Sequence, residues 1–390
     1  MNLKTLTIAI LAAALLADDA SASDEPPPSG YPAPPFDAWV AVDEIYVNPS
    51  LGRYWPSIAI LRYGDQVRVT RCAPDCNAPD AYAELAPFGA VRLSQLRASA
   101  RDRRGEFLAG DPEFVWARVL DRVVVARAAP AADAAEVERF RRDDELIFRT
   151  DASLAARGWY ERPGGGFVAA ASLRVLEPSR FAGWHEPPSN FAFVRTDAVL
   201  TRPDGTTTPV HRYDRFPVMT VTRTSVIVPD GELPKSAVRL GQRAQRPSRV
   251  PEGARWVHVS LDQQILTAYE GDRLAFATLV STGRRAGSTR AGLFEVRRKI
   301  TYTQMRGGGQ DPYSVEGVPW VLYFDGAIAL HGAFWHDGFG GARSHGCVNL
   351  APADARFLFD FAPPELPAGW RSVNPVALGV NTLWVDIAAN

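Results

Sequence analysis

Short apolar runs with alternating polar positions fill the chain between residues 37 and 242. The runs at 58–61, 66–70, 122–126 and 216–222 are rich in valine, isoleucine and threonine, and turn residues separate them. A period of two sends successive side chains to opposite faces of a strand, and closely spaced turns favour small barrels. This part of the chain is therefore predicted to be mainly β.

One segment departs from this pattern. Val137, Phe140 and Leu146 have the spacing of one helical face in and just beyond residues 131–145. We predict a helix here that inserts into the second barrel, and a solvated loop is the alternative.

Three segments of this region end alike, at residues 89–95, 166–173 and 235–242, which predicts an internal repeat. With the turn Gly64-Asp65 and the pair Gly158-Trp159, the layout resembles bacterial SH3-type domains. The resemblance implies two or three small SH3-like β-barrels, which bind wall peptide or glycan or only position another domain. Their predicted bounds are 37–100, 101–180 and 181–242.

The remaining third of the chain carries further strand-like runs. Residues 243–253 are polar and broken by proline, which predicts a linker. The glycines at 307–309 predict a loop. Pro352 and Asp354 open a predicted short helix, because proline suits the first helical position and an acidic residue suits the first turn. The predicted strands lie at 256–266, 267–272, 274–281, 318–324, 328–330 and 382–387.

The N-terminus has the pattern of a secretory signal peptide. Lys4 precedes an apolar run at 5–17, and an Ala-x-Ala site ends at Ala22, so we predict a signal peptide at 1–22. The run is too short for a stable membrane span, although an uncleaved anchor is the alternative. Residues 23–36 are proline-rich and predict an extended tether. We expect export to the periplasm or cell wall.

Charge and cysteine content narrow the partners. The formal net charge of −1 gives no electrostatic reason to expect nucleic acid. Of the 3 cysteines, Cys72 and Cys76 are close enough for a disulfide in an oxidising compartment. Cys347 is then left unpaired, which marks it as a candidate reactive thiol.

Residues 331–350 gather the chemistry of the chain. His331 opens this stretch, and Ser344-His345-Gly346-Cys347 lies near its end. A thiol attacks a carbonyl as thiolate and needs a base, for which His331 is the candidate. Gly346 allows a turn that would aim backbone amides at an oxyanion. A zinc site is the alternative, with ligands from His331, His336, His345 and Cys347.

The stretch closely resembles the catalytic signature of the L,D-transpeptidase (YkuD-type) family. The matching residues are His331, Gly332, Ser344, His345, Gly346, Cys347 and Asn349. The resemblance implies a catalytic β-sandwich at 254–390. Arg290 stands where the family has proline in a motif that begins at Thr289.

The resemblance implies an exported cysteine L,D-transpeptidase that forms a thioester with peptidoglycan stem peptides as donor and acceptor. Cys347 would be the nucleophile and His331 the general base and acid, oriented by the carbonyl of Gly332. Ser344, His345 and Gly346 would shape the nucleophile turn. Gly332, Tyr323, Trp335, Arg343 and Asn349 would line the substrate pocket.

No metal or organic cofactor is expected. A wall-anchored protein or water could replace the acceptor stem. The alternatives are a wall-binding module with a non-catalytic cleft and a metal-dependent peptidoglycan hydrolase.

Overall fold

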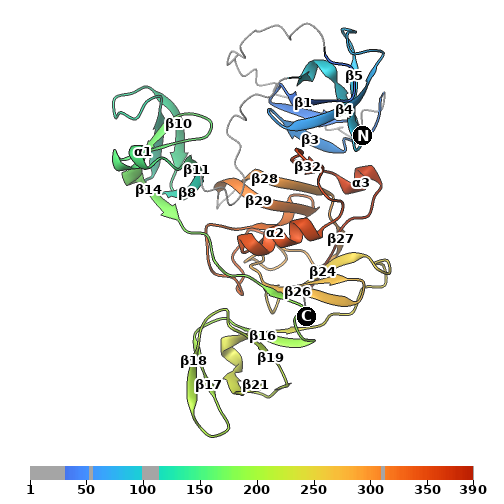
Figure 1. Ribbon diagram of the computed structural model, residues 1–390. Coiled ribbons are helices and arrows are strands. Elements are labelled where there is room, and N and C mark those ends of the chain that lie inside the picture. Colours follow the sequence, from blue (N-terminus) through green and yellow to red (C-terminus); the bar gives the residue numbers. More distant parts are fainter. Residues whose placement is uncertain (1–30, 52–55, 99–113, 309–311, 390) are drawn as a thin grey trace, which may run out of the picture.

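The computed structural model describes residues 31–51, 56–98, 114–308 and 312–389 (Figure 1). The predicted signal peptide and the tether up to residue 30 lie outside the described residues. Strands dominate the described part, which is mainly β, as predicted. No helix in these ranges is long and apolar enough to cross a membrane.

The first unit is built from a five-stranded sheet in the order β6-β5-β4-β1-β7 and the hairpin β2-β3. Tyr31, which we assigned to the tether, donates hydrogen bonds to the carbonyls of Leu93 and Leu96, so the unit begins before β1. Cys72 and Cys76 form a disulfide at the end of β4. The strands are β1 (Phe36–Val40), β2 (Glu44–Val47), β3 (Ala59–Arg62), β4 (Gln66–Ala73), β5 (Tyr82–Ala86), β6 (Ala90–Arg92) and β7 (Leu96–Arg97).

The second unit corrects the helix predicted at 131–145. That segment holds β10, which pairs antiparallel with β9, and the register shifts between Glu136 and Glu138. Val137 at this bulge is exposed, Phe140 is buried and Leu146 lies on β11, so the three residues that suggested a helical face share no face. The elements are β8 (Phe114–Val119), β9 (Val123–Arg127), β10 (Glu136–Arg141), β11 (Glu145–Arg149), α1 (Ala152–Ala156), β12 (Trp159–Glu161), β13 (Phe167–Ala169) and β14 (Leu173–Leu176).

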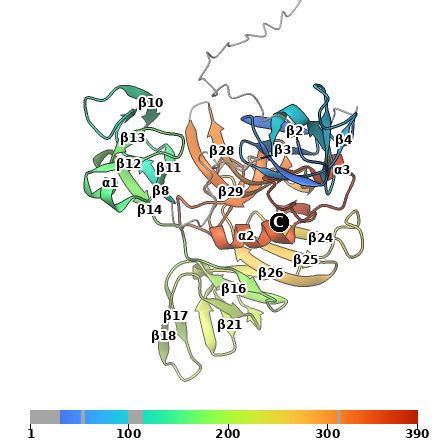
Figure 2. The same cartoon turned by 45° about the horizontal axis from the view of Figure 1, so that its top comes forward.

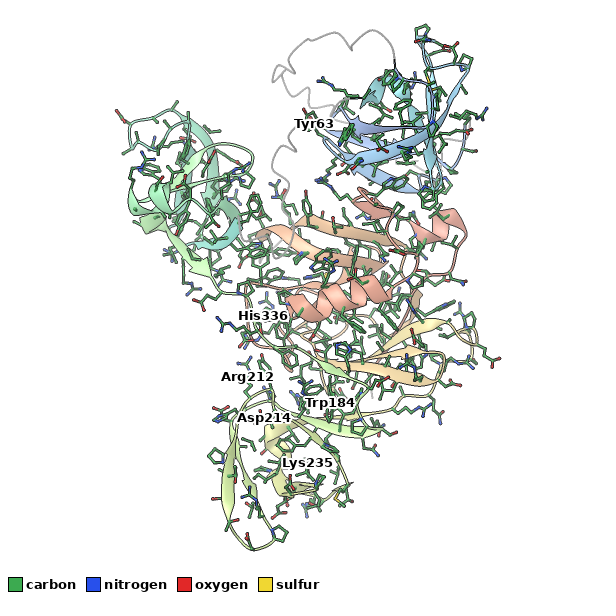
Figure 3. The ribbon with its side chains drawn as sticks, viewed as in Figure 1. Tyr63, Trp184, Arg212, Asp214, Lys235 and His336 are labelled. Atoms are coloured by element: carbon green, nitrogen blue, oxygen red, sulfur yellow. A yellow bond between two sulfur atoms is a disulfide. The ribbon has the colours of Figure 1, made fainter. Side chains whose placement is uncertain are left out.

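The third unit contains a three-stranded and a five-stranded sheet. Before it, β15 (Trp184–His185) pairs with β26 of the C-terminal domain, although we had placed these residues in the third repeat. Trp184 is labelled in Figure 3 at this junction. The strands are β16 (Asn190–Val194), β17 (Ala198–Thr201), β18 (Thr207–Val210), β19 (Arg215–Pro217), β20 (Thr220–Val221), β21 (Ser225–Val228), β22 (Gly231–Pro234) and β23 (Val238–Gln242).

The three segments that predicted a repeat share one local structure. Each contains a one-turn 3-10 helix between two strands: η1 (Leu93–Gln95), η2 (Ala170–Ser172) and η3 (Lys235–Ala237). No closed barrel is found among the described residues, so the SH3-like architecture stays a prediction.

The C-terminal domain encloses its core between two sheets. One has the order β15-β26-β25-β24-β33-β27, and the other contains β32, β28, β29, β30 and β31. The predicted short helix is present as α2 (Pro352–Phe361), and α3 (Pro375–Leu378) follows. The strands are β24 (Arg255–Ser260), β25 (Ile265–Glu270), β26 (Arg273–Leu279), β27 (Gly292–Glu295), β28 (Arg298–Gly307), β29 (Tyr313–Asp325), β30 (Ile328–Gly332), β31 (Val348–Leu350), β32 (Ser372–Val373) and β33 (Trp384–Ala388).

Leu266, Phe276, Leu330, Val348 and Leu358 are among the buried side chains between these layers. Fully burying one such side chain stabilises the fold by about 1.5–3 kcal/mol, so this core holds β30 and β31 firmly in place.

The hairpin β28-β29 is longer than the sequence predicted. Gly307 belongs to β28 rather than to a loop, and residues 309–311 lie outside the described ranges. Figure 2 shows this hairpin between the first and second units. Strand β11 of the second unit pairs with β29 in parallel, so the second unit extends a sheet of the C-terminal domain.

Candidate active site

Two neighbouring parallel strands carry His331 and Cys347. The register pairs His331 on β30 with Asn349 on β31, and Cys347 lies directly before β31. Because side chains alternate along a strand, Cys347 and Asn349 face the same side as His331. From strand spacing and rise, the Cα atoms of His331 and Cys347 are roughly 8 Å apart. Both side chains line one cleft of about 450 Å³.

His331 is oriented as a neutral base. Its ring is buried, and Nδ1 lies 3.0 Å from the carbonyl oxygen of Gly332, the contact we expected. Nδ1 therefore carries the proton, and Nε2 is left to accept one. Burial lowers the pKa of His331 to about 4, although the Gly332 contact opposes this.

Cys347 is a free, partly exposed cysteine whose Sγ lies 3.8 Å from the carbonyl oxygen of Ala327. Burial raises the pKa of the Cys347 thiol to about 11, more than the nearby Ala329 backbone lowers it. At neutral pH the pair is thus a thiol beside a neutral imidazole rather than a thiolate beside an imidazolium. Proton transfer to His331 would then accompany attack.

The turn before Cys347 depends on Gly346. Its φ is 154°, and a Cβ there would lie 2.7 Å from the backbone oxygen of Ser288. Ser344 Oγ accepts the Gly346 N–H at 3.0 Å and donates to the Cys347 carbonyl at 2.5 Å. The Gly346 amide is therefore engaged within the turn, and the amide of Cys347 stays a candidate oxyanion donor.

Thr289 fastens this turn to the rest of the domain. Its Oγ1 donates to the Gly346 carbonyl at 2.6 Å and accepts the Gly283 N–H at 2.8 Å. Arg290, which replaces the family's proline, points away into an ion pair with Asp325. Thr289 of the motif thus supports the turn before Cys347, whereas the departure at Arg290 does not affect that turn.

His345 lies on the wall of the cleft. Its ring stacks on Tyr313 of β29 at 4.5 Å, and its Nε2 lies 3.1 Å from the guanidinium of Arg284. Burial and the neighbouring arginines lower the pKa of His345. These contacts favour a role in shaping the turn over a role as base.

His336, labelled in Figure 3, is partly buried and lies against the buried side chain of Asn349. The Gly338 N–H donates to Nδ1 of His336, so its Nε2 carries the proton. Nδ2 of Asn349 lies 3.1 Å from that Nε2, so the Asn349 amide must be turned over before its carbonyl oxygen can accept the Nε2 proton. Burial lowers the pKa of His336 to about 4, which keeps the ring neutral.

The remaining expected pocket residues divide into two groups. Trp335 lines the cleft, with its ring centroid 5.7 Å from that of His331, and exposed Arg343 lines it too. Tyr323 instead packs in the apolar cluster beneath Cys347, where Arg298 covers its ring.

The third unit supports the loop that carries Trp335 and His336. Arg212 forms an ion pair with Asp337 at 3.3 Å, and the Tyr213 hydroxyl donates to the Asp337 carbonyl. Figure 3 shows Arg212 at the end of the third unit that faces His336.

Four cleft residues come from the second unit and were not anticipated. They are Arg118, Arg142, Asp143 and Glu145. They lie about two hundred residues before Cys347 and belong to no motif, so only the pairing of β11 with β29 reveals them.

The zinc alternative lacks a ligand set. Within the described ranges, no group of three or more His, Cys, Asp or Glu side chains is placed to hold a metal ion. His331 and His336 each use Nδ1 in a hydrogen bond to the backbone.

Comparison with known proteins assigns one part of the chain to a family. Residues 254–376 match the family model of the L,D-transpeptidase catalytic domain, YkuD. No protein of curated function matches the chain.

Several solved L,D-transpeptidase structures are similar. The Enterococcus faecium L,D-transpeptidase C442S mutant is 22% identical over 35% of this chain, with a TM-score of 0.28, and this chain spans only 50% of its length. The isolated E. faecium catalytic domain is 22% identical over 35% of this chain and 98% of that chain, also with a TM-score of 0.28. The Mycobacterium smegmatis L,D-transpeptidase is 16% identical over 56% of this chain and 89% of that chain, with a TM-score of 0.29. Such TM-scores carry no argument, and the assignment of residues 254–376 rests on the family model.

Proposed function

We propose that the protein is an exported L,D-transpeptidase that acts on peptidoglycan stem peptides through a thioester on Cys347. The observation that carries the proposal is that His331 on β30 and Cys347, directly before the adjacent parallel strand β31, line one cleft within the family-matching segment. Export rests on the signal-peptide pattern at 1–22.

In the first step Cys347 Sγ attacks the carbonyl that joins an L centre to a terminal D residue. The thiol proton moves to Nε2 of His331 as the carbon–sulfur bond forms. His331 then gives that proton to the leaving amine as the peptide bond breaks. Because Gly332 holds Nδ1–H, the imidazole keeps the tautomer that this cycle needs.

Backbone amides of the turn, that of Cys347 among them, would stabilise the oxyanion, and one such donor typically contributes about 3 kcal/mol or more. Ser344, Gly346 and Thr289 would hold these amides in place through the contacts within the turn.

In the second step an acceptor amine attacks the thioester. A carbon–nitrogen bond forms, the carbon–sulfur bond breaks, and His331 passes a proton from the amine to the sulfur. Water as acceptor would trim the stem, and a wall-anchored protein would be attached to it. Asn349, Trp335 and Arg343 would contact the donor stem, with Arg343 suited to a carboxylate.

A purified muropeptide with a tetrapeptide stem tests the proposal by mass spectrometry. We expect stem dimers or tripeptide stems with the wild type and no product with Cys347→Ala. A carbapenem should add to the intact mass of the wild type only. Unchanged muropeptide together with an unmodified protein would favour the wall-binding alternative.

A further inference from the structure

One wall of the cleft comes from outside the family-matching segment. Arg118 on β8, Arg142 and Asp143 in the turn after β10, and Glu145 on β11 all line it, together with Cys347. Residues 254–376 supply the nucleophile and base, so this charged wall is a separate contribution of the second unit.

Buried contacts fix the second unit to the C-terminal domain. Trp116 stacks on Phe334 with ring centroids 4.3 Å apart. Arg162 Nη2 donates to Glu316 of β29 at 2.7 Å, and the Ile147 N–H donates to the same carboxylate at 3.3 Å. The charged wall therefore has a defined position relative to Cys347.

Glu145 and Arg118 form the deeper part of this wall. Glu145 is 5% exposed, and Nε and Nη2 of Arg118 both donate to its Oε1, at 3.0 and 2.6 Å. Its Oε2 accepts no hydrogen bond from the described residues. Arg118 also donates to the Trp335 carbonyl at 3.4 Å, which connects the pair to the residue beside His331. Burial raises the pKa of Glu145 to about 7 despite Arg118, so a bound cation would favour its charged form.

Arg142 and Asp143 form the outer part. Both are exposed, and neither side chain has an ion pair or hydrogen bond with another described residue. Asp143 has a φ of 69°, a left-handed conformation at the tip of the turn. The cleft thus presents two guanidinium groups and two carboxylates on one side.

We propose that this wall is the acceptor subsite and that it binds an α-amino acid centre, with a free amine and a free carboxylate on one carbon. Glu145 and Asp143 face the ammonium group, and Arg142 and Arg118 face the carboxylate. A side-chain amine of a protein would contact only the two carboxylates, because it brings no carboxylate for the two arginines. Water carries no charge for either the carboxylates or the arginines. The inference rests on the proposed function and selects among its acceptors.

The charges also fit the proton balance of transfer. An ammonium group must lose one proton before it can attack and a second as the carbon–nitrogen bond forms. Glu145 takes the first and later releases it to water, and His331 moves the second to the departing sulfur.

The test compares three acceptors that share one skeleton: D-methionine, D-methionine amide and 3-(methylthio)propylamine. The enzyme is acylated with a tetrapeptide stem, and mass spectrometry gives the ratio of amine transfer to hydrolysis. We expect the wild type to favour D-methionine at least tenfold over the amide and over the amine. Arg142→Gln should abolish the preference for D-methionine over its amide. Glu145→Gln should lower the transfer ratio at least tenfold for all three acceptors.

Glu136→Gln is the matched control, because Glu136 forms an exposed ion pair with Arg139 on the same unit, outside the cleft. Asp143→Asn removes a carboxylate with little risk of misfolding, because asparagine tolerates a left-handed backbone. This variant should also lower the transfer ratio. The subsite would be overturned, with acylation left in place, if the wild type gave equal transfer ratios for the three acceptors. It would also be overturned if the transfer ratios stayed unchanged in all three variants, Arg142→Gln, Glu145→Gln and Asp143→Asn. Absence of any acyl-enzyme in the wild type would instead overturn the proposed function, and the subsite with it.

Discussion

Cys347 is expected to react slowly with small alkylating reagents, because its sulfur is protonated at rest. Burial raises the pKa of this thiol to about 11 and lowers that of His331 to about 4. Both shifts favour the neutral partners, so His331 does not generate a standing thiolate.

The size of the effect follows from the thiol pKa. The pKa of the thiol is raised from its ordinary value of 9.0 to about 11, so at neutral pH the thiolate fraction of Cys347 should be about 100-fold lower than that of free cysteine. Because the thiolate is the reacting species, the alkylation rate should be lower by about the same factor. Its rate should also rise about tenfold per pH unit, with no plateau in the neutral range.

The rate of alkylation by iodoacetamide is measured by intact-mass spectrometry between about pH 6 and 9.5, a range that includes the pKa of a free thiol. Without reductant the Cys72–Cys76 disulfide stays closed, so one label per chain reports Cys347 alone. The unfolded protein serves as the control and should behave like free cysteine. The protonated resting state would be refuted if the alkylation rate reached a plateau below about pH 8, which is under the pKa of a free thiol. It would also be refuted if the folded protein were alkylated faster than the unfolded chain. Slow alkylation would not argue against catalysis, since the proton leaves only during attack.

Three further outcomes test the packing around the site. Gly346→Ala should destabilise the fold by about 1–3 kcal/mol and reduce acylation, whereas Gly308→Ala, where a Cβ meets nothing within 4 Å, should change neither. The free energy of unfolding, measured with urea, should fall as the pH drops from about 6.5 to 4. In this range His331 binds a proton in the unfolded chain but not in the folded protein, and this residue alone should lower the free energy of unfolding by about 3 kcal/mol. Trp116→Ala should lower the thermal midpoint and cost about 3–5 kcal/mol, because it removes the stack on Phe334.

The sequence predicted the local features of the site well where they depend on short-range chemistry. Gly346 and Ser344 lie within the turn that the motif implied, and the Gly332 carbonyl holds His331 as expected. The helix after Cys347 begins at Pro352, where the proline and the following acidic residue placed it. Each of these features is decided by neighbours within a few residues.

The same reasoning failed where distant segments meet. The helical spacing of Val137, Phe140 and Leu146 was coincidental, because Val137 and Phe140 lie on opposite sides of β10 and Leu146 lies on β11. The pairing of β11 with β29 could not be foreseen. The sequence of neither strand contains a pattern that identifies the other as its partner. For that reason the charged wall of the cleft was missed, whereas His331 and Cys347, which line the same cleft, were anticipated from the motif.

The second unit is better understood as a packed part of the C-terminal domain than as a tethered module. Phe334 is 1% exposed in the structure, and it is covered by Trp116. Val315 and Val318 belong to the same cluster as Phe114 and Ile147 from the second unit. Removing the second unit would expose this apolar face directly beside the cleft, and such patches favour association with other surfaces. The residues that match the family thus depend on a neighbouring unit for both a covered surface and one side of the substrate cleft.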